Sequence, residues 1–215
     1  MNYIIEQCTP EWHALRCGKV TASRISDVTA SGRNGAPSKM RATYMGELIA
    51  ERLSGYQGEG FLSEPMRWGK ECEADARAAY AFYSSSSVEQ VGFIDHPSVV
   101  MSGCSPDGLV GCDGLLEIKC PNTSTHIATL LGSATAGEYF TQMQWQMACT
   151  GRQWCDFVSF DPRLPEHMRI KVIRVPRNNV TVFDLQQIVG VFQRELEAKL
   201  DALNEAYPCP TAVAA

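Results

Sequence analysis

The chain has 215 residues, of which 45% are apolar, and it carries a formal net charge of −5. This length and apolar content suffice for one substantial core, so we expect a single domain over residues 1–207 and a flexible tail over 208–215. The acidic balance excludes a protein coated in positive charge. With no apolar run of about 18 residues and no basic, apolar leader, the sequence predicts a cytoplasmic protein that does not enter a membrane.

The nine cysteines are an odd number, and they are scattered without the closely spaced pairs of structural zinc sites. We expect most of them to be small buried apolar residues rather than disulfide partners or metal ligands.

The first part of the chain is predicted to be mainly helical. Short helical pieces are expected over 12–16 and 20–28, a loop over 31–38, and longer helices over 40–53 and 68–83. The segment from Arg16 to Arg41 contains six basic residues and only one acid, Asp27. If the protein binds nucleic acid, this segment is the expected contact; the alternative is a solvated loop.

Strands and two further helices are predicted in the rest of the chain. We expect strands over 88–93, 99–104, 109–110, 115–120, 155–160 and 168–175, and a turn over 95–98. A helix is expected over 138–150. A long amphipathic helix is predicted to begin at a capping box over 181–184 and to run to about Ala206, with its apolar stripe (Leu185, Ile188, Val189, Phe192, Leu196, Leu200 and Leu203) facing the core.

The most informative motif is Ser105-Pro106-Asp107, followed ten residues after the aspartate by Glu117-Ile118-Lys119. Between the two halves, an Asp-Gly dipeptide at 113–114 interrupts apolar runs, which predicts a hairpin. The two acids then lie on adjacent antiparallel strands. Because side chains alternate along a strand, Glu117 and Lys119 share one face and Ile118 points to the other.

Two carboxylates and an ammonium on one face suit the hydrolysis of a phosphodiester. Mg²⁺ takes one or two carboxylates, a carbonyl, waters and substrate phosphate, so Asp107, Glu117 and the backbone carbonyl of Ile118 are candidate ligands. Lys119, roughly 7 Å along the strand from Glu117, can orient water, stabilise charge or accept a proton. The alternative is a surface Glu/Lys pair beside an unrelated turn aspartate.

These residues resemble the core of the phage-lambda-type 5′-to-3′ alkaline exonucleases, a viral recombinase branch of the PD-(D/E)xK nuclease superfamily. Further blocks are similar to that family in the same order: Trp12-His-x-Leu-Arg16, Thr21-Ala-Ser23, Trp68-Gly-Lys-x-x-Glu73-x-Asp-Ala-Arg77, Gln142-x-Gln144 and Asp161-Pro-Arg163. The resemblance implies an α/β fold of the restriction-endonuclease type, with a mixed central β-sheet flanked by α-helices in a single domain.

The resemblance also assigns site residues. It implies that Asp107, Glu117 and the Ile118 carbonyl hold two Mg²⁺ ions, with Mn²⁺ as a substitute, that Lys119 assists the water, and that Glu73 is a further acid at the metal. It implies a pocket for a terminal 5′-phosphate, formed by Arg16, Ser23, Ser105 and Gln142.

Three more positions follow from the resemblance. Gln144 is expected to support the site. Arg33 is expected to reach into the DNA minor groove; the alternative is that Arg33 is a loop arginine that contacts no DNA. Met66 aligns with an apolar wedge that separates the end base pairs, where the family has leucine.

The activity implied is that of a processive Mg²⁺-dependent exonuclease. Such an enzyme removes mononucleotides from the 5′-phosphorylated strand of linear duplex DNA and leaves a 3′ single-stranded overhang. The family resemblance further implies a homotrimeric ring around DNA and, as partner, a single-strand annealing protein.

Two other hypotheses remain open at this level. One is another nuclease of the superfamily, either a restriction-type endonuclease or an iron–sulfur exonuclease; the absence of a clustered cysteine quartet counts against the latter. The other is a DNA-end-binding module without catalysis, against which the intact Asp107, Glu117 and Lys119 count.

Overall fold

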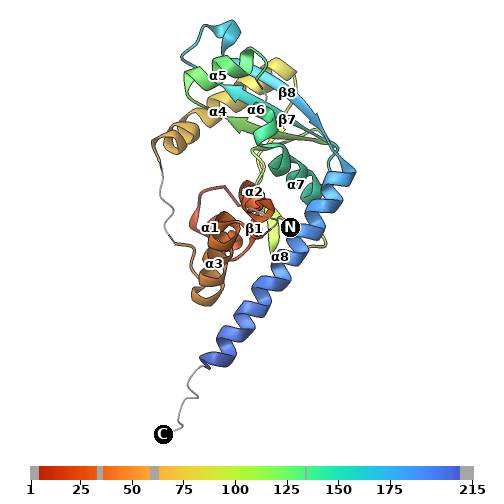
Figure 1. Cartoon of the computed structure of the whole chain (residues 1–215). Coiled ribbons are helices and arrows are strands. Elements are labelled where there is room, and N and C mark those ends of the chain that lie inside the picture. The colour runs from red at the N-terminus through yellow and green to blue at the C-terminus, as the bar shows by residue number, and fades with distance from the viewer. Residues whose placement is uncertain (1–4, 33–35, 59–62, 134, 209–215) are drawn as a thin grey trace.

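A five-stranded sheet, formed by strands between residues 88 and 176, is the central element of the fold (Figure 1). The computed structural model describes residues 5–32, 36–58, 63–133 and 135–208. The strand order is β2-β5-β6-β7-β8, with β6 and β7 parallel and the other neighbours antiparallel. The strands are β2 (Val88–Glu89), β5 (Gly108–Val110), β6 (Gly114–Lys119), β7 (Trp154–Phe160) and β8 (Ile170–Pro176). The predicted mixed central sheet is confirmed.

A second, three-stranded sheet was not predicted. It has the order β1-β4-β3 and comprises β1 (Val20–Thr21), β4 (Ser102–Cys104) and β3 (Ile94–Asp95). The predicted continuous strand over 88–93 is therefore wrong, because the chain pairs with β5 only at Val88–Glu89 and then crosses to the small sheet. The strand over 99–104 is correspondingly shorter.

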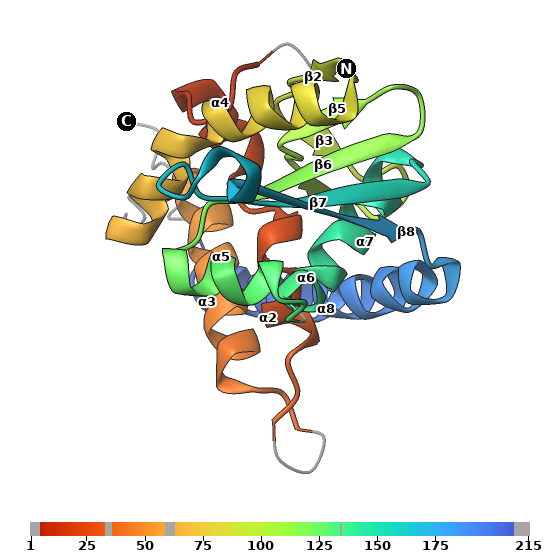
Figure 2. The same ribbon diagram turned by 90° about the horizontal axis from the view of Figure 1, so that it is seen from above.

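Helices cover both faces of the larger sheet, as the resemblance implied. Figure 2 shows α4 (Glu64–Ser84) on one face, with α5 (Thr123–Leu130), α7 (Phe140–Thr150) and α8 (Asn179–Ala206) on the other. The short α6 (Thr135–Glu138) precedes α7, so the helix predicted over 138–150 is interrupted at Tyr139. Among the residues that the structure describes, two 3₁₀ turns, η1 (Ala22–Arg24) and η3 (Glu166–Met168), lie in the connections.

The N-terminal helices pack around the small sheet. They are α1 (Pro10–Arg16), α2 (Ile25–Thr29) and α3 (Lys39–Ser54). The helix predicted over 20–28 is wrong in its first half, since this segment enters the small sheet through β1 and turns through η1 before α2 begins. Ser38 caps α3 by accepting a hydrogen bond from the Arg41 backbone N–H.

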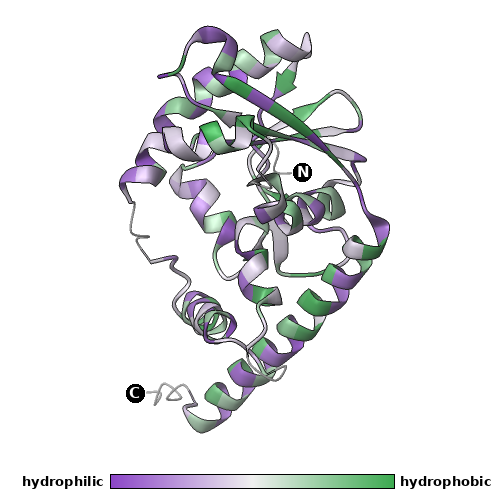
Figure 3. Cartoon of the chain, turned by 45° about the horizontal axis from the view of Figure 1, so that its top comes forward, coloured by the Kyte–Doolittle hydropathy of each residue, from purple (hydrophilic) through white to green (hydrophobic). Residues whose placement is uncertain are grey.

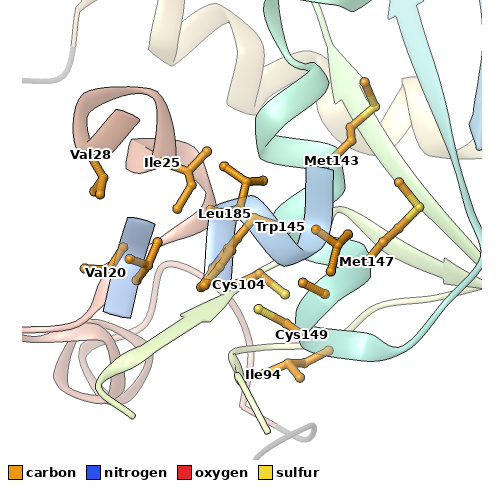
Figure 4. Packing of buried hydrophobic residues seen from close by; sticks show 14 of the residues in the cluster. Val20, Ile25, Val28, Ile94, Cys104, Met143, Trp145, Met147, Cys149 and Leu185 are labelled. Carbon is orange, nitrogen blue, oxygen red and sulfur yellow. The ribbon is translucent and has the colours of Figure 1, made fainter. Parts of the chain in front are cut away.

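Two apolar clusters lie on opposite faces of β6. One contains Leu116 and Ile118 with Tyr80 of α4. The other contains Leu115 together with buried residues of α7, α8 and the small sheet. Figure 4 shows Trp145 and Leu185 within it. The predicted alternation along 115–119 is thereby confirmed.

The cysteines behave largely as small apolar residues. Five are buried (Cys72, Cys104, Cys120, Cys149 and Cys155), and every cysteine in the described ranges is a free thiol.

The long helix α8 has 28 residues and an amphipathic pattern that is visible in Figure 3. It begins two residues earlier than predicted, because the Asn178 side chain, not a capping box at Thr181, accepts the hydrogen bond of the Thr181 N–H at 3.0 Å. Ile188 and Leu203, expected on the core stripe, are instead 39% and 36% exposed. Among the helices in the described ranges, none combines the length and apolar character needed to cross a bilayer.

Candidate active site on the β5–β6 hairpin

The predicted hairpin brings the two acids together. Gly108 pairs with Leu116 across the antiparallel β5–β6 ladder, and the Asp107 N–H donates to the Leu116 carbonyl at 3.1 Å. Asp107 therefore lies beside Glu117. The Oδ2 atom of Asp107 accepts the Ile118 N–H at 2.6 Å, which fixes the carboxylate against the strand.

Glu117 is only 1% exposed, and three side chains bind its carboxylate. Oε1 accepts a hydrogen bond from Gln142 Nε2 at 2.7 Å and lies 2.5 Å from Lys119 Nζ, while Oε2 accepts from Gln146 Nε2 at 2.6 Å. Gln142 and Gln146 are one helical turn apart on α7, so both amides reach the same side of the helix. The sequence-based prediction missed Gln146, although its i, i+4 spacing from Gln142 was a usable signal.

Lys119 is held as a cation beside the two acids. Burial alone would lower its pKa, but the carboxylates of Glu117 and Asp107 raise the pKa of Lys119 above its ordinary value. Its ammonium also lies 4.8 Å from the ring centroid of Tyr139. This environment favours charge stabilisation or orientation over proton acceptance among the roles predicted for Lys119.

The donor set fits a hard divalent cation. Burial, followed by the charge of neighbouring Glu117, raises the pKa of Asp107 well above its usual range. A cation between the two carboxylates would relieve this repulsion, and Mg²⁺ requires only one or two protein carboxylates beside waters and phosphate. In the described ranges, no group of three or more His, Cys, Asp or Glu side chains is placed to hold a metal, so the fit rests on this pair.

Glu73 lies near the hairpin but has a different partner. On α4, its carboxylate forms an ion pair with Arg77, whose Nε donates to the Asp107 carbonyl at 3.1 Å. Glu73 contributes to the raised pKa of Asp107, which places its charge nearby. Its role as a further metal ligand stays a prediction, and Arg77 emerges as the residue that connects α4 to the Asp107 backbone.

Arg16 and Ser105, predicted to share a phosphate pocket, are in contact. Ser105 Oγ accepts hydrogen bonds from Arg16 Nη1 at 3.3 Å and from the Trp12 indole N–H at 3.0 Å. The Arg16 guanidinium stacks 3.9 Å from the Trp12 ring centroid, and its Nε is buried without a partner. Trp12 thus orients this pair. A buried guanidinium with an unused donor suits an anionic ligand.

The other predicted pocket residues do not join this pair. Gln142 binds Glu117, and Ser23 is exposed on η1, with its hydroxyl 3.3 Å from that of Thr21. Each remains a predicted phosphate ligand.

The prediction for Gln144 needs correction. This residue is fully buried, donates to the Pro176 carbonyl at 2.9 Å and accepts the Asn178 N–H at 2.8 Å. It ties α7 to the start of α8 and faces away from the site because it lies two residues from both Gln142 and Gln146 on the helix.

The predicted DNA contacts Met66 and Arg33 have separate outcomes. Met66, in the first turn of α4, is 56% exposed, as a wedge would need to be, and stays a prediction. Arg33 lies outside the described residues.

Half of the basic residues between Arg16 and Arg41 are neutralised within the fold. Lys19 pairs with Asp95, Arg24 with Asp27 and Glu47, and Arg41 with Glu195. The segment is therefore a weaker candidate for a continuous nucleic-acid contact than its composition suggested.

Comparison with known proteins decides the family. Residues 11–153 match the YqaJ-like viral recombinase domain. This chain is a member of the YqaJ-like viral recombinase family. The matched range contains Arg16, Asp107, Glu117, Lys119 and Gln146. No curated protein matches the chain.

Solved structures agree with this assignment. An alkaline exonuclease from Laribacter hongkongensis, LHK-Exo, is 47% identical and has a TM-score of 0.85, over 92% of this chain and 97% of its own. A second structure of LHK-Exo, in complex with dAMP, matches with the same values. A phage-related exonuclease from Haemophilus somnus 129PT, 16% identical, shares the fold with a TM-score of 0.70 over 86% and 96% of the two chains.

The predicted resemblance to the phage-type alkaline exonucleases is thus confirmed for this YqaJ-family protein. The enzyme class predicted with it, an exodeoxyribonuclease, agrees with the activity of the LHK-Exo relative.

Proposed function

We propose that this YqaJ-family protein is a Mg²⁺-dependent, processive exonuclease that degrades the 5′-phosphorylated strand of linear duplex DNA to mononucleotides. The observation that carries the proposal is the placement of the Arg16–Ser105 contact only two residues from Asp107, beside the paired acids of the hairpin. The short connection between β4 and β5, which contains Ser105 and Asp107, would then hold the DNA end and present it for cleavage. The exonuclease activity of LHK-Exo, and its structure with a deoxynucleoside monophosphate, support this reading.

Asp107, Glu117 and the Ile118 carbonyl are the proposed metal ligands, with Glu73 as a further candidate. When bound there, two Mg²⁺ ions, or Mn²⁺ as substitute, supply charge neutralisation and an acidified water. Gln142 and Gln146 hold the Glu117 carboxylate in place, and Arg77 holds the backbone of Asp107. Lys119, kept protonated by its acidic neighbours, stabilises the negative charge that develops on the phosphate.

The end-binding pocket gives the reaction its direction. Arg16 offers a planar guanidinium that can bind phosphate oxygens through two nitrogens, and Ser105 adds a hydroxyl. Ser23 and Gln142 would complete the contacts to the terminal phosphate. Met66 would separate the end base pairs, and Arg33 would contact the minor groove.

The resulting 3′ overhang suits single-strand-annealing recombination and double-strand break processing in the cytoplasm of a bacterial or phage-infected cell.

We propose a homotrimer that encircles DNA and an annealing protein as partner. A ring reconciles a chain of net charge −5 with DNA binding, because only the channel needs to be basic. The acidic outer residues of α8 (Asp184, Glu195, Glu197, Asp201 and Glu205) fit a face turned away from DNA.

A time course on linear duplex DNA labelled at one 5′ end tests the activity. The label should be released as mononucleotide only with a 5′-phosphate and Mg²⁺ present, and closed circular duplex should stay intact. Cutting of circular DNA would favour an endonuclease, and release from the 3′ strand would refute the polarity. Native mass measurement of the assembly tests the trimer.

A further inference from the structure

The turn between α1 and β1 directly follows Arg16 and is held by contacts to α3. Gly18 has a left-handed backbone with φ 71°, and the Lys19 N–H donates back to the Arg16 carbonyl at 3.0 Å. A Cβ atom on Gly18 would lie 2.6 Å from Cγ of Arg52. The turn thus rests directly against the side of α3, and glycine is required both for the conformation and for the close approach.

Two consecutive residues of α3 bind both polar backbone groups of Gly18. Its N–H donates to Glu51 Oε2 at 2.6 Å, and its carbonyl accepts from Arg52 Nε at 2.8 Å. A peptide held at both groups has its orientation as well as its position defined. The helix that ends at Arg16 is therefore fixed at its C-terminal side.

The same arginine connects this turn to α8 and to the small sheet. Arg52 Nη2 donates to Gln193 Oε1 at 2.6 Å, and Nη1 donates to Glu197 Oε1 at 2.5 Å. Gln193 Nε2 in turn donates at 2.7 Å to the carbonyl of Met101, which also accepts the Val20 N–H at 2.9 Å. Met101 directly precedes β4.

This network therefore holds both segments that lead to the end-binding pocket. One segment is α1, which presents Arg16; the other is β4, which leads to Ser105. The Arg52 side chain is 9% exposed and Gln193 is 7% exposed. Since all three guanidinium nitrogens of Arg52 have protein acceptors, Arg52 is not placed to bind DNA itself.

We infer that Arg52 and Gln193 are positioning residues that keep Arg16 and Ser105 in register for the terminal phosphate of the DNA substrate. The inference rests on the proposed function and adds to it a structural cause for end selectivity. Loss of the network should loosen the pocket without touching the metal carboxylates, so discrimination between ends should suffer more than hydrolysis.

Arg41 provides a matched control. It also lies on α3, is 13% exposed, and joins α3 to α8 through a 2.8 Å ion pair with Glu195 and a contact to the Phe192 ring. It thus resembles Arg52 in helix pairing but does not extend to Gly18 or Gln193.

The test compares Arg52→Met, Gln193→Met and Arg41→Met with the full-length wild type. Methionine is unbranched and apolar, matches glutamine in length and the aliphatic part of arginine, and removes the hydrogen-bonding groups of both. The measurement is kcat/KM on linear duplexes with a 5′-phosphate and with a 5′-hydroxyl, with thermal unfolding followed in parallel. We expect the phosphate-to-hydroxyl ratio to fall on the order of tenfold in the Arg52 and Gln193 variants and to stay at the wild-type value in Arg41→Met.

Each outcome is decisive. A wild-type ratio in both network variants, or an equal fall in Arg41→Met, overturns the positioning role while leaving the nuclease assignment intact. If Arg52→Met does not fold, Gln193→Met carries the comparison alone. If the wild type itself does not degrade linear duplex, or ignores the 5′-phosphate, the proposed function fails first and the inference fails with it.

Discussion

Gln146 of α7 donates a 2.6 Å hydrogen bond to the Oε2 atom of Glu117, a carboxylate that is almost completely buried. A buried charge must have its oxygens satisfied, since an unpaired one costs about 1–3 kcal/mol or more. Gln146 therefore supports the most enclosed acid of the candidate site.

Replacing Gln146 with leucine should lower the exonuclease rate by roughly 10- to 100-fold and raise the Mg²⁺ concentration needed for half-maximal activity. Loss of a side chain that holds a metal ligand in place commonly has an effect of this size. Gln144→Leu is the control, because Gln144 is equally buried on the same helix but bonds Pro176 and Asn178. It should cost stability and leave the Mg²⁺ requirement of the folded protein unchanged. An unaltered Mg²⁺ titration in Gln146→Leu would contradict the role.

Asp107→Ala and Lys119→Ala should each lower hydrolysis on the order of 10³-fold or more while DNA binding remains measurable. Asp107 is a proposed metal ligand, and Lys119 is the only ammonium that pairs with Glu117 in the described structure. Single-turnover cleavage and fluorescence anisotropy on the same duplex separate the two effects. Turnover within tenfold of the wild type in either variant would remove that residue from the site.

Arg16→Ala should abolish the preference for 5′-phosphorylated over 5′-hydroxyl ends. The guanidinium is the charged group that contacts Ser105, and its buried Nε is free for an anion. Trp12→Phe, which keeps a ring for stacking but loses the indole hydrogen bond to Ser105, should weaken the preference less. Competition between the two labelled substrates gives the ratio directly, and an unchanged ratio in Arg16→Ala would refute the pocket.

His96 should make stability depend on pH. It is 6% exposed, and its Nδ1 accepts the backbone N–H groups of Ser98 and Val99 at 3.1 and 2.9 Å. Burial, together with the charge of Arg177, lowers the pKa of His96 from 6.5 to about 4. The unfolded chain then binds more protons between these values, so the contribution is complete above pH 6.5 and is lost as the pH falls toward 4.

The contribution of His96 to the free energy of unfolding is at most about 3 kcal/mol, because each pKa unit corresponds to about 1.4 kcal/mol. Denaturant unfolding at several pH values between 4 and 8 measures it. His96→Asn, whose amide oxygen can accept the same two N–H groups, should flatten the curve in this window. An identical pH dependence in both proteins would assign the effect to other groups.

Local patterns predicted the part of the site that depends on local chemistry. The hairpin signal around 113–114 and the period-two alternation of 115–119 are properties of neighbouring residues. The hairpin and the alternation are confirmed, but Val110 pairs with Gly114, so the turn is Gly111–Asp113 and Gly114 already begins β6. Helix α5 was missed because its first turn, Thr123-Ser124-Thr125, has low helix propensity and depends on the Asn122 cap.

The sequence by itself determined the hairpin, the face shared by Glu117 and Lys119, and, through its ordered blocks, the family. Only the tertiary structure decided that Gln146 supports Glu117, that Gln144 faces the core, that Arg77 reaches Asp107, and that Arg52 connects α8 to the turn behind Arg16. The physical reason is the sequence separation over which each interaction acts. Strand alternation and turn geometry act over a few residues, whereas Arg16 and Ser105 are 89 residues apart and meet only because the small sheet forms.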